Sequence, residues 1–187
     1  MLVLITGGSG SGKSSYAEEY LSMLSKDETK YYIATMQVYD EEGKKKIERH
    51  RSMRSGKGFV TIEQPMKIES ALDSIVQYES ENIMPQSQSK RIALLECMSN
   101  LTANEMFSGE NITDGKVVVD RILSGIQKLT NEIEHLVIVT NNVFEDGCVY
   151  DEMTMEYIKA MGGINEELAV RADQVIEVVV GIPVVIK

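Results

Sequence analysis

The 187-residue sequence has few cysteines and no long apolar run, and each absence excludes a class of protein. Its two cysteines, Cys97 and Cys148, do not fit the spacing of a metal site. Because nothing in the sequence marks it for secretion, we expect reduced thiols rather than a disulfide. No apolar stretch has the length of a membrane span, and residues 1–6 lack the length and basic flank of a signal peptide. We therefore expect a cytoplasmic protein that does not insert into membranes.

Positive charge is also scarce. The chain has 19 Lys and Arg against 29 Asp and Glu, which gives a formal net charge of −10 at pH 7. Such a surface repels a phosphate backbone, so we do not expect nucleic acid as a partner. The basic residues gather in one segment, from Lys44 to Lys57. Length and a hydrophobic content of 43% predict one globular domain over residues 1–187.

Residues 7–14 form a glycine-rich stretch directly after the apolar run 2–6. They match the pattern G-x-x-x-x-G-K-[ST], placed where a strand is expected to lead into a helix. Glycines let backbone N–H groups surround phosphates, Lys13 can neutralise the β- and γ-phosphates, and the Ser14 hydroxyl can bind Mg²⁺. A flexible loop with a surface lysine is the alternative, and the flanking strand and helix argue against it. The predicted nucleotide-binding residues here are Gly7, Gly8, Ser9, Gly10, Ser11, Gly12, Lys13 and Ser14.

Strand-like and helix-like stretches alternate along the chain, as is typical of an α/β protein. The predicted strands are 2–5, 30–34, 59–62, 91–96, 135–140, 175–180 and 184–186. The predicted helices are 13–25, 40–53, 65–78, 117–130 and 151–171, with a surface loop over 79–90. The last two strands, joined by residues 181–183, are expected to be antiparallel. The prediction is an α/β, three-layer P-loop NTPase-like (RecA-like) domain with a mostly parallel sheet and an antiparallel C-terminal edge pair.

Several stretches beyond the glycine-rich loop match one known family in the same order along the chain. They are residues 5–14, 17–18, 32–35, 47–51, Arg54, 61–65, 95–97, Asn104, 139–141, Asn165, 168–169, 172–173 and 179–183. On these residues the chain resembles the bifunctional adenosylcobinamide kinase / adenosylcobinamide-phosphate guanylyltransferase enzymes of cobalamin biosynthesis. The resemblance implies phosphorylation of adenosylcobinamide by GTP or ATP, and then transfer of GMP from GTP through a guanylyl-histidine. It also implies a homo-oligomer, a trimer.

The chain has two histidines that could carry the guanylyl group, His50 and His135. His135 begins a predicted buried strand, so we expect a packing role for it. His50 lies in the basic segment, where the residues alone would suggest a solvated surface histidine. The resemblance implies instead that His50 is the nucleophile, and neutral imidazole is chemically suited to this near pH 7.

The residues around His50 suit the same role. Arg54 lies four positions further on and therefore shares a helical face with His50. The guanidinium groups of Arg51 and Arg54 would neutralise charge on the α-phosphate during transfer. The alternative, a basic helix that is simply solvated, stays open.

Further nucleotide contacts are implied by the resemblance at Thr35, Met36, Gln37 and Glu63. Glu96 ends a buried strand, which is where a P-loop protein places the carboxylate that holds Mg²⁺ directly or through water. An exposed acid at a strand end is the alternative, and it has more weight for Glu63 than for Glu96.

The match to the family fails after Asn141. Asn142 replaces a glutamate, residues 144–149 replace a glycine-rich turn, and Met155 and Ile158 stand where basic residues are expected. Two other functions therefore remain open: a P-loop kinase with a different acceptor and no guanylylation, and a nucleotide-binding regulatory protein. The presence of His50 favours the bifunctional enzyme.

Overall fold

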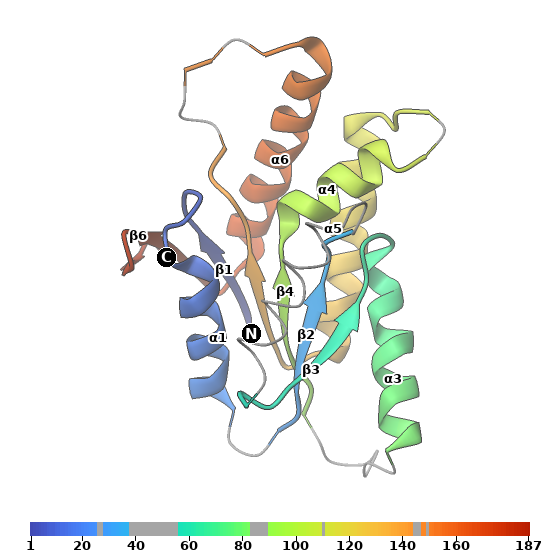
Figure 1. Ribbon diagram of the computed structural model, residues 1–187, viewed down its shortest axis with the longest axis vertical. Helices are drawn as coiled ribbons and strands as arrows, with labels where there is room; N and C mark the ends of the chain where they lie inside the picture. The colour runs from blue at the N-terminus through green and yellow to red at the C-terminus, as the bar shows by residue number, and fades with distance from the viewer. Residues whose placement is uncertain (26–27, 38–55, 83–89, 110, 144–146, 149) are drawn as a thin grey trace.

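The computed structural model describes residues 1–25, 28–37, 56–82, 90–109, 111–143, 147–148 and 150–187. Its strands form one sheet in the order β3-β2-β4-β5-β1-β6-β7 (Figure 1). They are β1 Leu2–Thr6, β2 Lys30–Ala34, β3 Phe59–Glu63, β4 Ile92–Glu96, β5 His135–Val139, β6 Gln174–Val179 and β7 Ile182–Val185. All pairings are parallel except β6 with β7. The mostly parallel sheet and its antiparallel edge pair are thus confirmed.

Helices cover both faces of this sheet (Figure 1). They are α1 Lys13–Leu24, the 3₁₀ helix η1 Ile68–Ser70, α3 Ala71–Glu81, α4 Met98–Phe107, α5 Gly115–Glu132 and α6 Glu152–Arg171. Because side chains alternate along a strand, Val3 and Ile5 of β1 pack with α1, while Leu2 and Leu4 belong to the core shared with α3, α5 and α6. The three-layer arrangement is confirmed.

The helix α4 was not predicted from the sequence. It buries Met98, Leu101 and Met106, but Asn104 and Glu105 are buried as well. Polar and apolar residues therefore do not separate onto two faces, and the periodicity that marks an amphipathic helix is lost. The polar groups are satisfied in the fold: Glu105, for example, accepts hydrogen bonds from the Lys67 backbone N–H at 2.6 Å and from Arg121 at 2.7 Å.

The helix predicted over residues 65–78 is shifted toward the C-terminus. It begins as η1 at Ile68 and continues as α3 to Glu81, so residues 79–81 are helical rather than part of a loop. The cause is Glu79, which is buried and receives hydrogen bonds from the Arg91 guanidinium at 2.9 and 2.7 Å. Arg91 holds the pKa of Glu79 below its ordinary value. The helix predicted over 40–53 lies outside the described residues.

The last hairpin is tighter than predicted, because β6 ends one residue earlier and β7 begins two residues earlier. Val179 pairs with Ile182, so Val180 and Gly181 alone form the turn. Their φ values of 46° and 84° are both positive, which is the geometry of the tight turns that join antiparallel strands. The Gly181 backbone N–H donates to the carbonyl of Ser11 at 2.8 Å, so this turn contacts the glycine-rich loop.

Two expectations from composition can be compared with the described part of the chain. Within it, no helix is both long and apolar enough to cross a membrane. Cys97 and Cys148, which both lie within it, are not joined in a disulfide.

Two glycines inside helices give opposite predictions for stability. A Cβ at Gly125 of α5 would lie 2.5 Å from the Cγ2 of Ile68, a side chain that is fully buried, whereas a Cβ at Gly163 of α6 would meet Val119 at 3.9 Å. We expect Gly125→Ala to lower the free energy of unfolding by about 1–3 kcal/mol through overpacking. Gly163→Ala should raise it by about 0.5–1 kcal/mol, because alanine loses less backbone freedom on folding. Urea denaturation of both variants measures this, and equal effects of the two substitutions would contradict it.

Candidate active site

The glycine-rich loop connects the end of β1 with the start of α1, as predicted. Gly12 precedes the helix with a φ of 91°, a conformation that favours glycine. Gly7 is needed for close packing, because a Cβ there would lie 2.6 Å from the carbonyl oxygen of Val178 in β6. The loop is therefore held between β1, α1 and the β6–β7 hairpin, with the helix N-terminus directed toward it.

Lys13 is buried at the start of α1, with 8% of its surface exposed. Its Nζ donates a hydrogen bond to the Gly8 carbonyl oxygen at 3.0 Å, so the ammonium group lies across the loop. Burial lowers the pKa of Lys13, while the nearby Cys97 and Glu96 oppose that shift. A phosphate placed in the loop would give this ammonium group a charged partner in place of the carbonyl.

Glu96 ends β4 and faces the first turn of α1. The Ser14 hydroxyl donates to its Oε1 at 2.5 Å, and the Tyr32 hydroxyl of β2 donates to its Oε2 at 2.9 Å. A hydroxyl and a carboxylate are the hard oxygen ligands that suit Mg²⁺, so Ser14 and Glu96 fit the metal expected of a P-loop protein. When bound, Mg²⁺ would neutralise charge on the nucleotide phosphates. Within the described ranges there is no cluster of three His, Cys, Asp or Glu that could hold a metal ion.

Thr35 follows β2 and connects several elements behind Glu96. Its hydroxyl donates to the Cys97 carbonyl at 2.8 Å and accepts from the Cys97 N–H at 2.7 Å. The side chain of Asn104 in α4 donates to the carbonyl oxygens of Thr35 at 2.8 Å and Pro65 at 2.9 Å. Thr35 is completely buried, and its hydroxyl is engaged by backbone.

The other predicted site residues belong to segments outside the glycine-rich loop. Met36 and Gln37 follow Thr35, and the side-chain oxygen of Gln37 accepts a hydrogen bond from Ser108 after α4 at 3.1 Å. Glu63 ends β3 at the sheet edge and is exposed. The three residues of the predicted guanylyl-transfer set, His50, Arg51 and Arg54, lie outside the described residues.

The end of the basic segment is attached to α1. Lys57 Nζ lies 2.6 Å from Oε2 of Glu18, whose side chain is 9% exposed. Glu18 stands one helical turn after Ser14, so this ion pair fixes the chain that leaves the basic segment beside the helix that leaves the loop.

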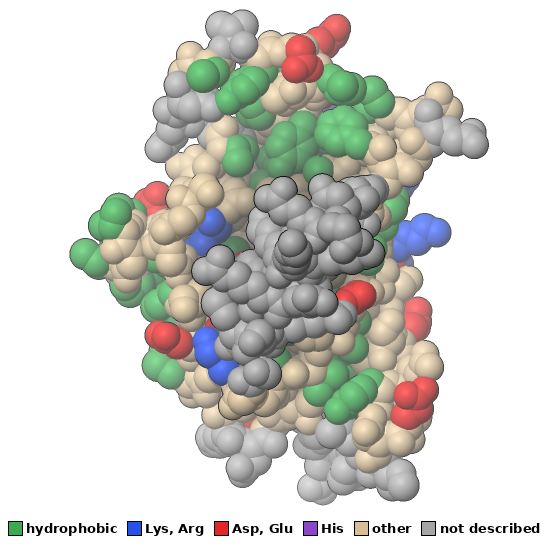
Figure 2. Space-filling view, in the orientation of Figure 1, with side chains coloured by type: hydrophobic (Ala, Val, Ile, Leu, Met, Phe, Trp, Pro, Cys, Tyr) green, Lys and Arg blue, Asp and Glu red, His purple; other side chains and the backbone are tan. Residues whose placement is uncertain are grey.

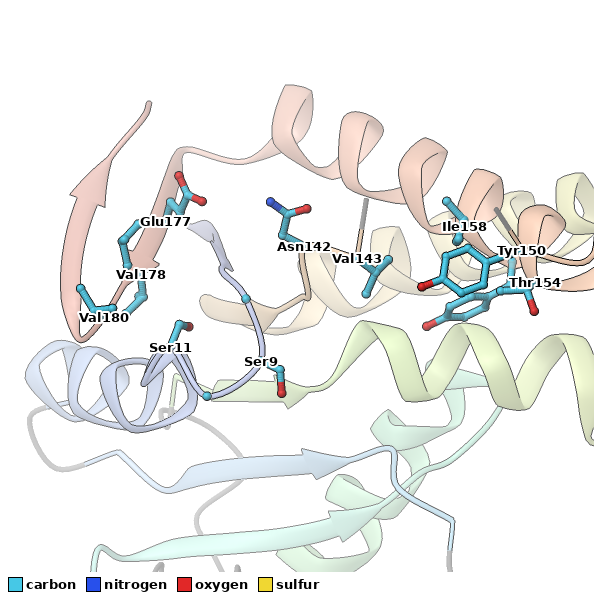
Figure 3. A pocket seen from close by; sticks show the side chains of 14 residues that line it. Ser9, Ser11, Asn142, Val143, Tyr150, Thr154, Ile158, Glu177, Val178 and Val180 are labelled. Carbon is cyan, nitrogen blue, oxygen red and sulfur yellow. The ribbon is translucent and has the colours of Figure 1, made fainter. Parts of the chain in front are cut away.

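A cavity of about 760 Å³ opens on the side of the loop that faces the start of α6. Figure 3 shows it between the loop, the chain that follows β5, the first turns of α6, and the end of β6. The sequence analysis did not predict this site, because its walls come from segments distant in the sequence. The lining residues are Gly8, Ser9, Gly10, Ser11, Asn142, Val143, Tyr150, Thr154, Tyr157, Ile158, Glu177, Val178, Val179 and Val180.

Comparison with known proteins assigns the chain to a family. A family model described as cobinamide kinase / cobinamide phosphate guanyltransferase matches residues 3–186. The chain belongs to this family. It is 30% identical to the bifunctional adenosylcobalamin biosynthesis protein CobU of Escherichia coli, with 100% of both chains covered. It is 29% identical to CobU of Salmonella typhimurium, again over both full chains, and 25% identical to CobP of Pseudomonas aeruginosa, with 98% and 96% covered.

Two solved structures show a similar fold at low sequence identity. One solved ATPase domain superimposes with a TM-score of 0.52 at 11% identity, covering 94% of this chain and 68% of that one. A KaiC-like protein from Pyrococcus horikoshii gives 0.50 at 15% identity, with 94% and 69% covered. These likenesses confirm the predicted fold class for this member of the cobinamide kinase / cobinamide phosphate guanyltransferase family.

Tyr32 gives a test of the Glu96 geometry. Tyr32→Phe removes the donor to Oε2 but keeps the ring, which packs edge-on against Phe59. Glu96 is then less well oriented, and we expect the Mg²⁺ concentration for half-maximal GTP binding to rise roughly tenfold. Calorimetric GTP titrations at a series of Mg²⁺ concentrations measure this.

The neighbouring residue supplies the control. The Tyr31 hydroxyl donates at 3.0 Å to Glu79, in the core on the opposite face of the sheet. Tyr31→Phe should therefore lower the free energy of unfolding by about 1 kcal/mol without shifting the Mg²⁺ titration. Identical titrations for both variants would show that Tyr32 does not orient Glu96.

Proposed function

We propose that the protein phosphorylates adenosylcobinamide and transfers GMP from GTP to the resulting phosphate, in cobalamin biosynthesis. The observation that carries the proposal is the meeting of Lys13, Ser14 and Glu96 at the carboxyl edge of the sheet, in a chain that belongs to this family. The relatives named bifunctional adenosylcobalamin biosynthesis proteins support the same role.

In the kinase step, the loop N–H groups and Lys13 would hold the β- and γ-phosphates of GTP or ATP. The acceptor hydroxyl oxygen forms a bond to the γ-phosphorus as the bond to the bridging oxygen breaks, and the hydroxyl proton is released to solvent. The nucleoside diphosphate leaves with the electron pair of that bond. Lys13 would stabilise the charge that builds on the bridging oxygen.

In the guanylyl step, an imidazole nitrogen of His50 attacks the α-phosphorus of GTP and pyrophosphate leaves. A phosphate oxygen of the phosphorylated acceptor then attacks the same phosphorus and restores the free histidine. Arg51 and Arg54 would neutralise the α-phosphate. The ion pair of Lys57 with Glu18 supports this assignment, because it holds Lys57, which follows His50 by seven positions in the sequence, next to α1.

A second candidate function is a P-loop kinase for a different acceptor, without guanylylation. The start of α6 favours it, because Met155 and Ile158 replace the basic residues expected there and Ile158 lines the cavity beside the loop. A nucleotide-binding regulatory protein is a weaker alternative, because it would not need the pairing of Ser14 with Glu96.

Lys13→Ala tests the nucleotide site. The substitution removes the buried ammonium group, so phosphate charge loses its compensation and we expect GTP affinity to fall at least about 100-fold. Lys116→Ala, on the exposed start of α5, is the control and should leave GTP affinity unchanged. Calorimetry measures both, and undiminished GTP binding by Lys13→Ala would contradict the assignment of the loop.

Covalent labelling tests the guanylyl step. Incubation with Mg²⁺ and GTP labelled at the α-phosphate should leave acid-labile label on the protein, because phosphorus bound to imidazole nitrogen hydrolyses in acid. The label should be absent from His50→Ala and retained by His135→Ala, in which the other histidine of the chain is removed. Lack of label on the unaltered protein, together with turnover of adenosylcobinamide by ATP, would establish the kinase alone.

A further inference from the structure

The walls of the cavity beside the loop are mainly apolar on the side away from the loop. Val143, Tyr150, Tyr157 and Ile158 form this end, while Val178–Val180 line the cavity beside the loop. In Figure 3 the side chains of Tyr150, Thr154 and Ile158 gather near the start of α6, with Val143 between them and the loop. The volume, about 760 Å³, is that of a small-molecule site.

No basic side chain is found among the described residues that line this cavity. The described residues that line it include the carboxylate of Glu177 and no Lys or Arg. From Asn142 to Val170 the sequence contains a single basic residue, Lys159, and its Nζ pairs with Glu156 at 2.7 Å. Figure 2 shows hydrophobic and acidic side chains at the top of the view, where the first turns of α6 lie in Figure 1.

The cavity is continuous with the phosphate loop, since Gly8–Ser11 form one of its walls. A group bound there would lie directly beside a nucleotide phosphate held by the loop. We propose, on the basis of the proposed function, that this cavity receives the phosphoryl acceptor and selects an uncharged or cationic alcohol with an apolar body over an anionic acceptor.

The physical reason is desolvation. An anionic acceptor would lose its water, face Glu177 and find no guanidinium or ammonium group on the α6 side to compensate. An alcohol with an apolar body would lose little by the same transfer and would gain contact with the tyrosine and valine side chains. Phosphorylation therefore turns a favoured ligand into a disfavoured one, so the cavity releases the product of the kinase step.

Ile158→Arg tests this selectivity by adding a cation to the cavity wall. The binding of adenosylcobinamide and of adenosylcobinamide phosphate is measured by calorimetry for each protein. We expect the unaltered protein to bind the alcohol about tenfold more tightly than the phosphate, and Ile158→Arg to tighten binding of the phosphate about tenfold.

Val170→Arg is the matched control. It adds the same charge to the same helix at a side chain that is 70% exposed and does not line the cavity. It should change neither acceptor affinity. The proposal is overturned if the unaltered protein binds adenosylcobinamide phosphate as tightly as adenosylcobinamide. It is also overturned if Ile158→Arg changes the Kd for GTP but changes the Kd of neither corrinoid.

A second measurement does not depend on corrinoids. It compares a neutral fluorescent probe, prodan, with an anionic one, 1-anilinonaphthalene-8-sulfonate. Ile158→Arg should bind the anionic probe several-fold more tightly than Val170→Arg does, with prodan binding equal in both. If the probes respond in this way but the protein does not bind corrinoids, the proposed acceptor is refuted, while the selectivity of the cavity for charge is supported. Equal binding of the anionic probe by both variants would refute the selectivity.

Discussion

The candidate site depends on the hydrogen bonds that tie the end of β2 to the end of β4. Thr35 uses its hydroxyl both to donate to and to accept from the backbone of Cys97, and Asn104 connects the same point to the chain after β3. In a parallel sheet, adjacent strand ends have no hairpin between them, and here the buried side chains add to the backbone ladder, in which the Thr35 N–H donates to the Glu96 carbonyl at 3.0 Å. With these ends fixed, Glu96 faces Ser14 of α1 across the sheet edge. The position of this carboxylate thus depends on residues that are themselves buried.

Much of the fold could be predicted because its signals are local. The run before the loop, the spacing of Lys13 and Ser14 after the glycines, and the unbroken apolar strands each lie within a few residues. Parallel strands also bring their carboxyl ends to one edge, so the position of Glu96 near the loop could be expected from its place at the end of β4. The family resemblance, carried by motifs along the whole sequence, was confirmed. Single-domain organisation, cytoplasmic location and trimer assembly remain predictions, as do the roles of His50, Arg51 and Arg54.

The features that could not be predicted depend on contacts between distant residues. Helix α4 has no amphipathic pattern because Asn104 and Glu105 are satisfied inside the fold, and α3 extends because Glu79 meets Arg91. The role of Tyr32 requires knowing that β2 and β4 are neighbours, and the cavity requires α6 to lie near β6. A local sequence pattern indicates the secondary structure of one segment. It does not indicate which distant segment that one will contact.

The glycine-rich loop is synthesised before several of the segments that surround it in the fold. The first strand lies between β5 and β6, and the carbonyl of Ser11 pairs with the N–H of Gly181. The loop at residues 7–14 is therefore made before β6 and β7, which supply its last neighbours. Until β6 and β7 have emerged, β1 has an open edge and the loop has no wall on that side. On this topology, the loop reaches its folded surroundings only after the segment that follows α6 has been made.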